Sequence, residues 1–285
     1  MATEYRSIGT RTAYSTGTVS VSSDGLYVTL TGGSFNSAWG KGDSITIDGE
    51  ERFILSRLSD TVMLLQTAST KADLSGLSYT IDRSYSTLSA WNAAEINGKD
   101  LVALTTIPTA VMYNDSSYSG TNSISGATSS NATYHPVITA ADGHWHKGKK
   151  QGVVFDQGGT ATTSIGVSIP YTVVEKIRFT NYVGTGAGIR SAASTSNYTG
   201  VKFRLLFVHD VVFTTNNCEV HGFDLGASGN GGDIEECVVQ NIVNNGTTNC
   251  TVIGIYAGSG QSHVRNCVVH RVHAATTVRG FYLSF

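Results

Sequence analysis

Four stretches in the C-terminal half of the chain repeat one another at intervals of about thirty residues. They cover residues 174–177, 203–206, 234–237 and 264–267, so their starting points are 29, 31 and 30 residues apart. After each start the chain runs through Val, Ile, Leu and Phe, residues that fit a pleated and half-buried β-strand. No long stripe of apolar residues with the period of a helix occurs after residue 150. The pattern therefore predicts a unit built from strands and stacked along the chain.

A second motif follows each of these stretches and supplies the rest of the repeating unit. It is a glycine followed by Ile or Phe, at Gly188, Gly222, Gly254 and Gly280. The segments between the motifs are rich in Gly, Asn, Ser and Thr, and Gly and Asn accept the positive φ angles of turns. Two short strands and their turns, repeated every thirty residues, describe one coil of a parallel β-helix.

Alignment of the coils places charged residues in one column. Glu175, Arg204, Glu235 and Arg265 share this column, and their charges alternate in sign. Neighbouring strands lie about 4.8 Å apart, so the order predicts a ladder of ion pairs. Each exposed pair would contribute roughly a few tenths of a kcal/mol.

The four cysteines follow the same register. Cys237 and Cys267 are equivalent in the first motif, and Cys218 and Cys250 each lie four residues before the glycine of the second. Two disulfides or a metal site are one interpretation. No Cys-x-x-Cys spacing supports zinc, and parallel stacked side chains suit disulfide geometry poorly. We therefore expect free thiols packed in the core, where cysteine behaves as a small apolar residue.

The N-terminal part of the chain has short alternating strands and hairpin signals. We expect a polar arm over residues 1–15 and a small antiparallel barrel or sandwich over residues 16–83. The dipeptides Asp24-Gly25 and Asp48-Gly49 favour hairpin turns. The predicted strands of this module are 18–22, 27–31, 44–47, 52–55, 61–66 and 78–82.

One helix is predicted, over residues 87–96. Leu88 and Trp91 recur at helical spacing, Ser86 is the expected N-cap, and Gly98 is the expected residue after the helix end. A solenoid needs a cap over the apolar end of its first coil, and this helix is placed to provide it.

The capping helix and the parallel β-helix are expected over residues 84–285, which makes the whole chain all-β. Further strand material is predicted at 101–111, 137–140 and 152–156, and a loop at 116–132. The chain reaches Phe285 in the middle of a motif, so we expect it to lack a C-terminal cap.

Composition indicates the setting of the protein. Charged residues are 14% of the chain, against about 25% in an average soluble protein. A surface of Ser, Thr and Asn in place of ions is typical of extracellular β-rich fibrous proteins. The net charge of −2 gives no excess of positive charge for binding nucleic acid. No apolar stretch approaches the ~20 residues of a membrane span. We see no signal peptide after Met1 and expect a virion or extracellular-surface protein.

The order of the motifs resembles that of a known superfamily, the pectate-lyase-like right-handed parallel β-helix proteins. The likeness is to the form found in phage tail spikes and fibres and in bacterial surface proteins. It rests on the small β-module with its stretch 42–49, Leu88-x-x-Trp91, the segments 100–102, 124–128 and 152–155, and the coils that follow. The resemblance implies a right-handed parallel β-helix and a virion or extracellular setting. It implies no catalytic residue, because none of these motifs is catalytic.

Candidate chemistry is sparse and lies in two neighbouring polar columns. They contain His209, Gln240 and His270 in one column and Asp210, Asn241 and Arg271 in the next. These six residues are the candidates for binding a glycan, and the alternative is an ordinary solvated face. A glycosidase needs two carboxylates about 5–10 Å apart, but here acids alternate with Arg and Asn, so we assign no catalytic residue. We also expect no metal site and no cofactor, and we interpret His144-Trp145-His146 as an exposed loop.

These observations favour a structural and attachment protein of a virion, of the tail-spike or fibre kind. Its coils would present a surface to a host polysaccharide. We expect a homo-oligomer, with a trimer implied by the resemblance, and contacts to other virion or fibre proteins through the N-terminal region. We expect no binding to nucleic acid and no membrane span. The alternatives are a polysaccharide-degrading glycosidase or lyase and a bacterial surface adhesin or fibril subunit.

Overall fold

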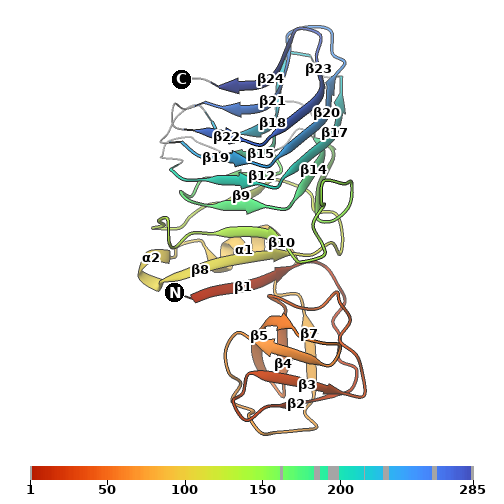
Figure 1. Ribbon diagram of the computed structural model, residues 1–285, viewed down its shortest axis with the longest axis vertical. Helices are drawn as coiled ribbons and strands as arrows, with labels where there is room; N and C mark the ends of the chain where they lie inside the picture. Colours follow the sequence, from red (N-terminus) through yellow and green to blue (C-terminus); the bar gives the residue numbers. More distant parts are fainter. Residues whose placement is uncertain are drawn as a thin grey trace.

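The protein is mostly β-strand, with one antiparallel sheet at the N-terminal end and three parallel sheets stacked away from it (Figure 1). The computed structural model describes residues 2–160, 163–182, 187–191, 199–214, 216–226, 231–258 and 262–283, and leaves out the side chains of 160 and 187–191. Residues 284 and 285, part of the expected final motif, lie outside this description. No helix in the described part has the length and apolar character needed to cross a membrane.

The N-terminal module is an antiparallel sheet of six strands that curls into a half-barrel. Across the sheet these are β2 (Thr18–Val21), β3 (Tyr27–Thr31), β6 (Val62–Leu65), β5 (Glu50–Arg57), β4 (Ser44–Ile47) and β7 (Tyr79–Asp82). All six predicted strands of the module are confirmed. Asp48 and Gly49 both have positive φ angles, 45° and 83°, as a two-residue hairpin turn requires. The buried side chains of these strands form a core separate from that of the parallel sheets.

Three parallel sheets build the rest of the protein. Sheet I consists of β1 (Ala2–Ile8), β8 (Thr106–Met112), β10 (Val137–Ala140), β13 (Val173–Glu175), β16 (Lys202–Arg204), β19 (Asp233–Glu235) and β22 (His263–Arg265). Sheet II consists of β11 (Val154–Thr160), β14 (Arg178–Tyr182), β17 (Phe207–Phe213), β20 (Val238–Asn244) and β23 (Val268–His273). Sheet III consists of β9 (Asn122–Ile124), β12 (Ile165–Val167), β15 (Ala187–Ser191), β18 (Cys218–Asp224), β21 (Cys250–Ala257) and β24 (Thr277–Leu283).

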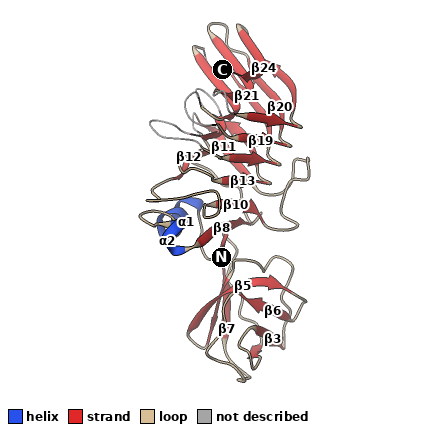
Figure 2. Ribbon diagram, turned by 60° about the vertical axis from the view of Figure 1, so that its left-hand side comes forward, coloured by secondary structure: helices blue, strands red, loops and turns tan. Residues whose placement is uncertain are grey.

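From β10 onward the chain passes through sheets I, II and III in turn and then returns to sheet I. We call one such circuit a coil, for example β16, β17 and β18. Each coil pairs in parallel register with the one before it, and Val174, Phe203, Ile234 and Val264 are aligned as predicted. This arrangement is compatible with a β-helix (Figure 2).

The prediction of two strands per coil is wrong, because the first apolar run of each repeat bends into two strands. The bends lie at Lys176, Leu205, Glu236 and Asn266, which all adopt left-handed φ angles of 52–65°. The left-handed residue turns the chain at this point, and residues before the bend join sheet I while residues after it join sheet II. Three of these four residues are neither Gly nor Asn, so the sequence carried no clear turn signal there.

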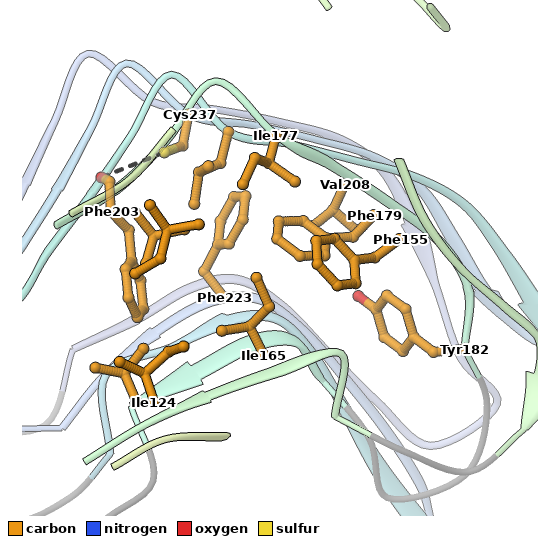
Figure 3. Close-up of a cluster of buried hydrophobic side chains, with 14 of the residues drawn as sticks. Ile124, Phe155, Ile165, Ile177, Phe179, Tyr182, Phe203, Val208, Phe223 and Cys237 are labelled. Atoms are coloured by element: carbon orange, nitrogen blue, oxygen red, sulfur yellow. Dashed lines mark hydrogen bonds between the residues drawn. The ribbon is translucent and has the colours of Figure 1, made fainter. Parts of the chain in front are cut away.

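The core lies between the three sheets and repeats from coil to coil. Its side chains include stacked aromatic rings, such as Phe155 and Phe179, whose centroids are 5.6 Å apart (Figure 3). Cys237 is fully buried beside Phe203, and its thiol donates to the Phe203 carbonyl. Cys218, Cys237 and Cys250 are free thiols buried in the core, and Cys218 aligns with Cys250, as predicted, whereas Cys267 is only partly buried.

The glycine of the second motif has a steric cause. A Cβ on Gly222 would lie 2.4 Å from the Gly254 carbonyl oxygen and 2.9 Å from Val239 across the core. A Cβ on Gly254 would lie 2.6 Å from both the Gly280 carbonyl oxygen and Val269. At Gly222 and Gly254, glycine is therefore a packing requirement of sheet III against sheet II.

The predicted ladder of charges is present on the outer face of sheet I. Glu175, Arg204, Glu235 and Arg265 are aligned on successive strands. Arg204 Nε lies 2.5 Å from Glu175 Oε2, and Arg265 Nη1 lies 3.5 Å from Glu235 Oε1. The acids of this column are thus neutralised by neighbouring arginines.

The region before the regular coils differs from the prediction in four places. The expected N-terminal arm contains β1, which pairs in parallel with β8. The helix α1 (Leu88–Glu95) is capped by Thr87, whose side chain accepts from the Ala90 amide, and Ser86 is not the cap. Residues 101–104 form a second helix, α2 (Leu101–Leu104), because Asp100 caps it and Thr105 ends it in left-handed geometry. The expected loop 116–132 contains β9.

Helix α1 packs at the first coil, where a cap was expected. Its Leu88 and Trp91 are buried in the same core as Ile8, Ala110 and Ile124. These contacts cover the end of the apolar column that faces the module.

Candidate functional site

Sheet II places the six predicted glycan-binding residues together on its outer face. His209 aligns with Gln240, and Gln240 aligns with His270. On β17, Val208 and Val211 both point into the core. The two residues between them therefore face outward, and the same holds for Gln240-Asn241 and His270-Arg271 on the next strands.

A repeated backbone irregularity produces these outward pairs. Asp210, Asn241 and Arg271 have φ angles of 53°, 58° and 55°. Strand pairing skips them, continuing from His209 and Gln240 directly to the next core residues. The left-handed residue falls at the same position on each strand, so the strands stay in register on both sides of it. Arg271 is the unusual member, because Asp and Asn tolerate this geometry better than long side chains do.

Asp210 is the one carboxylate among these six residues, which we call the sheet II strip. It contacts the Lys150 ammonium group, accepts from Asn241 Nδ2 at 2.8 Å, and lies 3.1 Å from His209 Nδ1. Burial alone would raise the pKa of Asp210, but these hydrogen bonds outweigh it and lower the pKa to about 2. Asp210 is thus a permanent anion whose oxygens are already engaged, which suits positioning better than proton transfer.

His209 is neutral in this arrangement. Burial lowers its pKa, and Arg178, which can only donate, directs Nη1 toward His209 Nε2 at 3.2 Å. The remaining ring nitrogen then carries the proton and donates to Asp210. Only 3% of His209 is exposed, so it supports Asp210 and is not accessible to a glycan.

The loop that contains His144-Trp145-His146 contacts the lower coils of sheet II. His146 accepts from the Gly148 amide through Nδ1 and donates through Nε2 to the Leu205 carbonyl at 2.6 Å. Burial lowers the pKa of both histidines of this segment. His146 is buried rather than exposed, and both of its nitrogens are used by the fold. The accessible part of the strip is therefore at Gln240, Asn241, His270 and Arg271.

Sheet III carries a second cluster of polar side chains, formed by Glu219, His221 and Asp224, which the sequence did not predict. On β18, His221 Nε2 lies 2.7 Å from Glu219 Oε1, and His221 Nδ1 lies 3.0 Å from Asp224 Oδ2. Asp224 is buried and also accepts from the Gly226 amide at 2.6 Å. The i and i+2 spacing of Glu219 and His221 was visible in the sequence. The irregular pairing at Gly222, which lets Asp224 reach the same ring, was not.

The His221 ring is held as an imidazolium. Both of its nitrogens face carboxylates, which can only accept, so both must donate. Burial lowers its pKa, but the contacts with Asp224 and Glu219 outweigh burial and raise it overall. The side chain of Glu219 is 55% exposed and that of His221 only 11%, so this group presents the Glu219 carboxylate to solvent and keeps the protonated ring behind it.

In the described ranges, no group of three or more His, Cys, Asp and Glu residues is placed to hold a metal ion. Comparison with family models, with curated proteins and with solved structures finds no match to this chain. The assignment of a function therefore rests on the geometry of the outer faces.

Proposed function

We propose that this chain is a right-handed parallel β-helix of the pectate-lyase-like kind and serves as an attachment protein of a virion. The support for the fold is the succession of coils through three parallel sheets in register. Its coils would extend outward from the N-terminal module, which would contact other virion or fibre proteins. A bacterial surface adhesin or fibril subunit would use the same architecture.

The observation that carries the glycan-binding proposal is the column of left-handed residues on the outer face of sheet II, with polar side chains beside it. On four successive coils one residue of the strand has left-handed geometry, at Asn181, Asp210, Asn241 and Arg271. Such geometry costs roughly 1–2 kcal/mol for an ordinary side chain, and strained residues that persist cluster at functional positions. We infer that the strip binds a host-surface polysaccharide.

The side chains of the strip suit a polyol. Amide and imidazole groups at Gln240, Asn241 and His270 both donate and accept, and the Arg271 guanidinium offers planar donors. The coils repeat every ~4.8 Å, so an extended chain with regularly spaced hydroxyls can contact several coils at once.

A panel of immobilised bacterial surface polysaccharides tests the proposal. The wild-type protein should bind at least one of them, and the double variant His270→Ala, Arg271→Ala should bind at least tenfold more weakly. The matched control is His263→Ala, Arg265→Ala, which removes an exposed His and Arg from sheet I of the same coil. Equal losses in both double variants, or no binding by the wild type, contradict the proposal.

The homo-oligomer is part of the proposal and has its own test. A trimer should sediment with about three times the 30.1 kDa mass of one chain. A compact monomer at micromolar concentration, with no association into fibres in electron micrographs, contradicts this part.

A polysaccharide-degrading enzyme is the second candidate, and the group around His221 favours it. A protonated ring beside an exposed carboxylate can donate a proton to a leaving oxygen. This candidate predicts release of oligosaccharides from a polysaccharide panel. The release should be lost in His221→Gln and in Asp224→Asn, but not in Asp73→Asn, which changes an exposed acid of the module.

A further inference from the structure

We propose that the junction between the N-terminal module and sheet I is a second binding site, which takes a neutral sugar unit. A cavity of 640 Å³ lies there, within the range of ligand sites in proteins. Its floor is the outer face of β1, β8 and β10, and its walls come from the module segments 37–41 and 56–57. It lies apart from the strip on sheet II, and its test does not depend on that strip.

The wall of the cavity is held rigid by a buried ion network. The Gly40 amide donates to Asp43 Oδ2 at 2.7 Å, and Asp43 Oδ1 lies 2.6 Å from Arg83 Nη1. Arg83 also pairs with Asp115 at 2.7 Å, and its guanidinium lies 3.6 Å from the centroid of the Tyr113 ring. These contacts join the module to the residues that follow β8, so the cavity is preformed and binding would cost little ordering.

The segment that carries Lys41 is fixed at its backbone. The Tyr113 hydroxyl donates to the Lys41 carbonyl at 3.0 Å. A Cβ at Gly42 would lie 2.7 Å from the Ser7 amide nitrogen, and Gly42 has a φ of 84°. The chain therefore passes close against β1 here and presents the Lys41 side chain over Tyr5, at 4.8 Å from the ring centroid.

The cavity contains one unpaired charge of each sign. Other charged groups that line it are paired, since Arg57 contacts Asp60 and Glu175 contacts Arg204. Within the described part of the chain, neither Lys41 nor Asp142 forms an ion pair, although both line the cavity. An anionic ligand would face the carboxylate and a cationic ligand would face the ammonium group, so neither charge is favoured.

The remaining lining matches a sugar ring. The hydroxyls of Thr3, Ser37 and Ser56 have no hydrogen-bond partner among the described residues, so they are available to a ligand. Ile107, which is partly exposed, supplies apolar surface on the floor. A neutral sugar has hydroxyls that donate to a carboxylate and accept from an ammonium group, and C–H faces that pack on apolar surface. These are the three kinds of contact that the cavity offers.

Titration of the full chain with oligosaccharides tests this site, with calorimetry or saturation-transfer NMR as the readout. The probes are neutral oligosaccharides of glucose, galactose, mannose and N-acetylglucosamine, beside uronic-acid and sialic-acid oligosaccharides. We expect a neutral probe to bind and its affinity to fall at least tenfold in Lys41→Met and in Asp142→Asn. The controls Lys147→Met and Asp73→Asn change exposed groups outside the cavity and should bind as the wild type.

The outcomes separate this site from the sheet II strip. The double variant His270→Ala, Arg271→Ala should keep its affinity for the neutral probe, whatever happens to polysaccharide binding. Failure of every neutral probe to bind, preference for an acidic probe, or unchanged affinity in both cavity variants overturns the proposal. Circular dichroism checks that each variant retains the wild-type fold.

Discussion

The glycine column of sheet III leads to a sharp prediction about stability. Replacing Gly254 with Ala adds a Cβ that would lie 2.6 Å from the Gly280 carbonyl oxygen and 2.6 Å from Val269 Cγ1. Real Cβ atoms do not approach other atoms so closely, and a paired backbone carbonyl cannot turn away as a flexible side chain can. The coil must therefore shift, and forcing extra volume into a packed core costs roughly 1–3 kcal/mol.

Gly280→Ala is the matched control, on the next strand of the same column. A Cβ there would have its nearest neighbour, Val269 Cγ1, at 3.8 Å, which is ordinary contact. Because Gly in a strand interior is less favourable than Ala by roughly 0.5–1 kcal/mol, this substitution should be neutral or slightly stabilising. The two variants should thus differ by about 1.5–4 kcal/mol, the sum of both effects.

Thermal unfolding followed by circular dichroism measures the difference. A change of 1 kcal/mol shifts the midpoint by about 2–4 °C in chains of 150–250 residues, so Gly254→Ala should unfold several degrees below Gly280→Ala. Equal midpoints for the two variants would refute the stacked register, because the carbonyl of the next coil would not lie over Gly254.

Three further results are expected. Arg83→Met should destabilise the protein by about 3–5 kcal/mol in thermal unfolding, because it leaves the buried carboxylates of Asp43 and Asp115 without their partner. The control Arg265→Met removes an exposed arginine of the ladder and should cost no more than about 1 kcal/mol. NMR titration should show a raised pKa for His221 that falls in Asp224→Asn. The stabilisation from this protonated ring is complete below the ordinary histidine pKa of about 6.5 and is lost as pH rises through the raised pKa. A contribution of His221 to stability that does not change with pH would contradict the ion pairs of His221 with Glu219 and Asp224. Iodoacetamide should label Cys267 before Cys237, because Cys267 is only partly buried and the neighbouring Cys237 lowers its pKa, whereas burial raises the pKa of Cys237. Faster labelling of Cys237 argues against this arrangement.

The repeat in the sequence predicted the coil register well because stacked positions carry matching residue types in successive coils. Alternating charge at Glu175 and Arg204, paired cysteines, and glycine at Gly222 and Gly254 each follow from side chains stacked on their neighbours. The number of strands per coil could not be found in the same way. The bends that divide sheets I and II fall on Lys176, Leu205 and Glu236, whose side chains give no sign of left-handed geometry.

The candidate site was predictable only in part. The columns of His209 and Asp210 followed from the repeat, but the burial of His209 depends on contacts with other segments. The group at His221 depends on the irregular pairing at Gly222. The junction cavity joins segments that lie far apart along the chain, such as Lys41 and Asp142. Such sites depend on tertiary placement, which no local pattern records.

The central claim is that the outer face of the coils binds a polysaccharide without altering it. The most direct test incubates the protein with its best-bound polysaccharide and measures both the bound fraction and the length distribution of the polymer. We expect the wild-type protein to bind the polysaccharide saturably and to leave the polymer length unchanged, and we expect the variant His270→Ala, Arg271→Ala to lose this binding. If the polymer is shortened by the wild type and not by His221→Gln, the protein is a polysaccharide-degrading enzyme and the claim of binding without alteration is wrong.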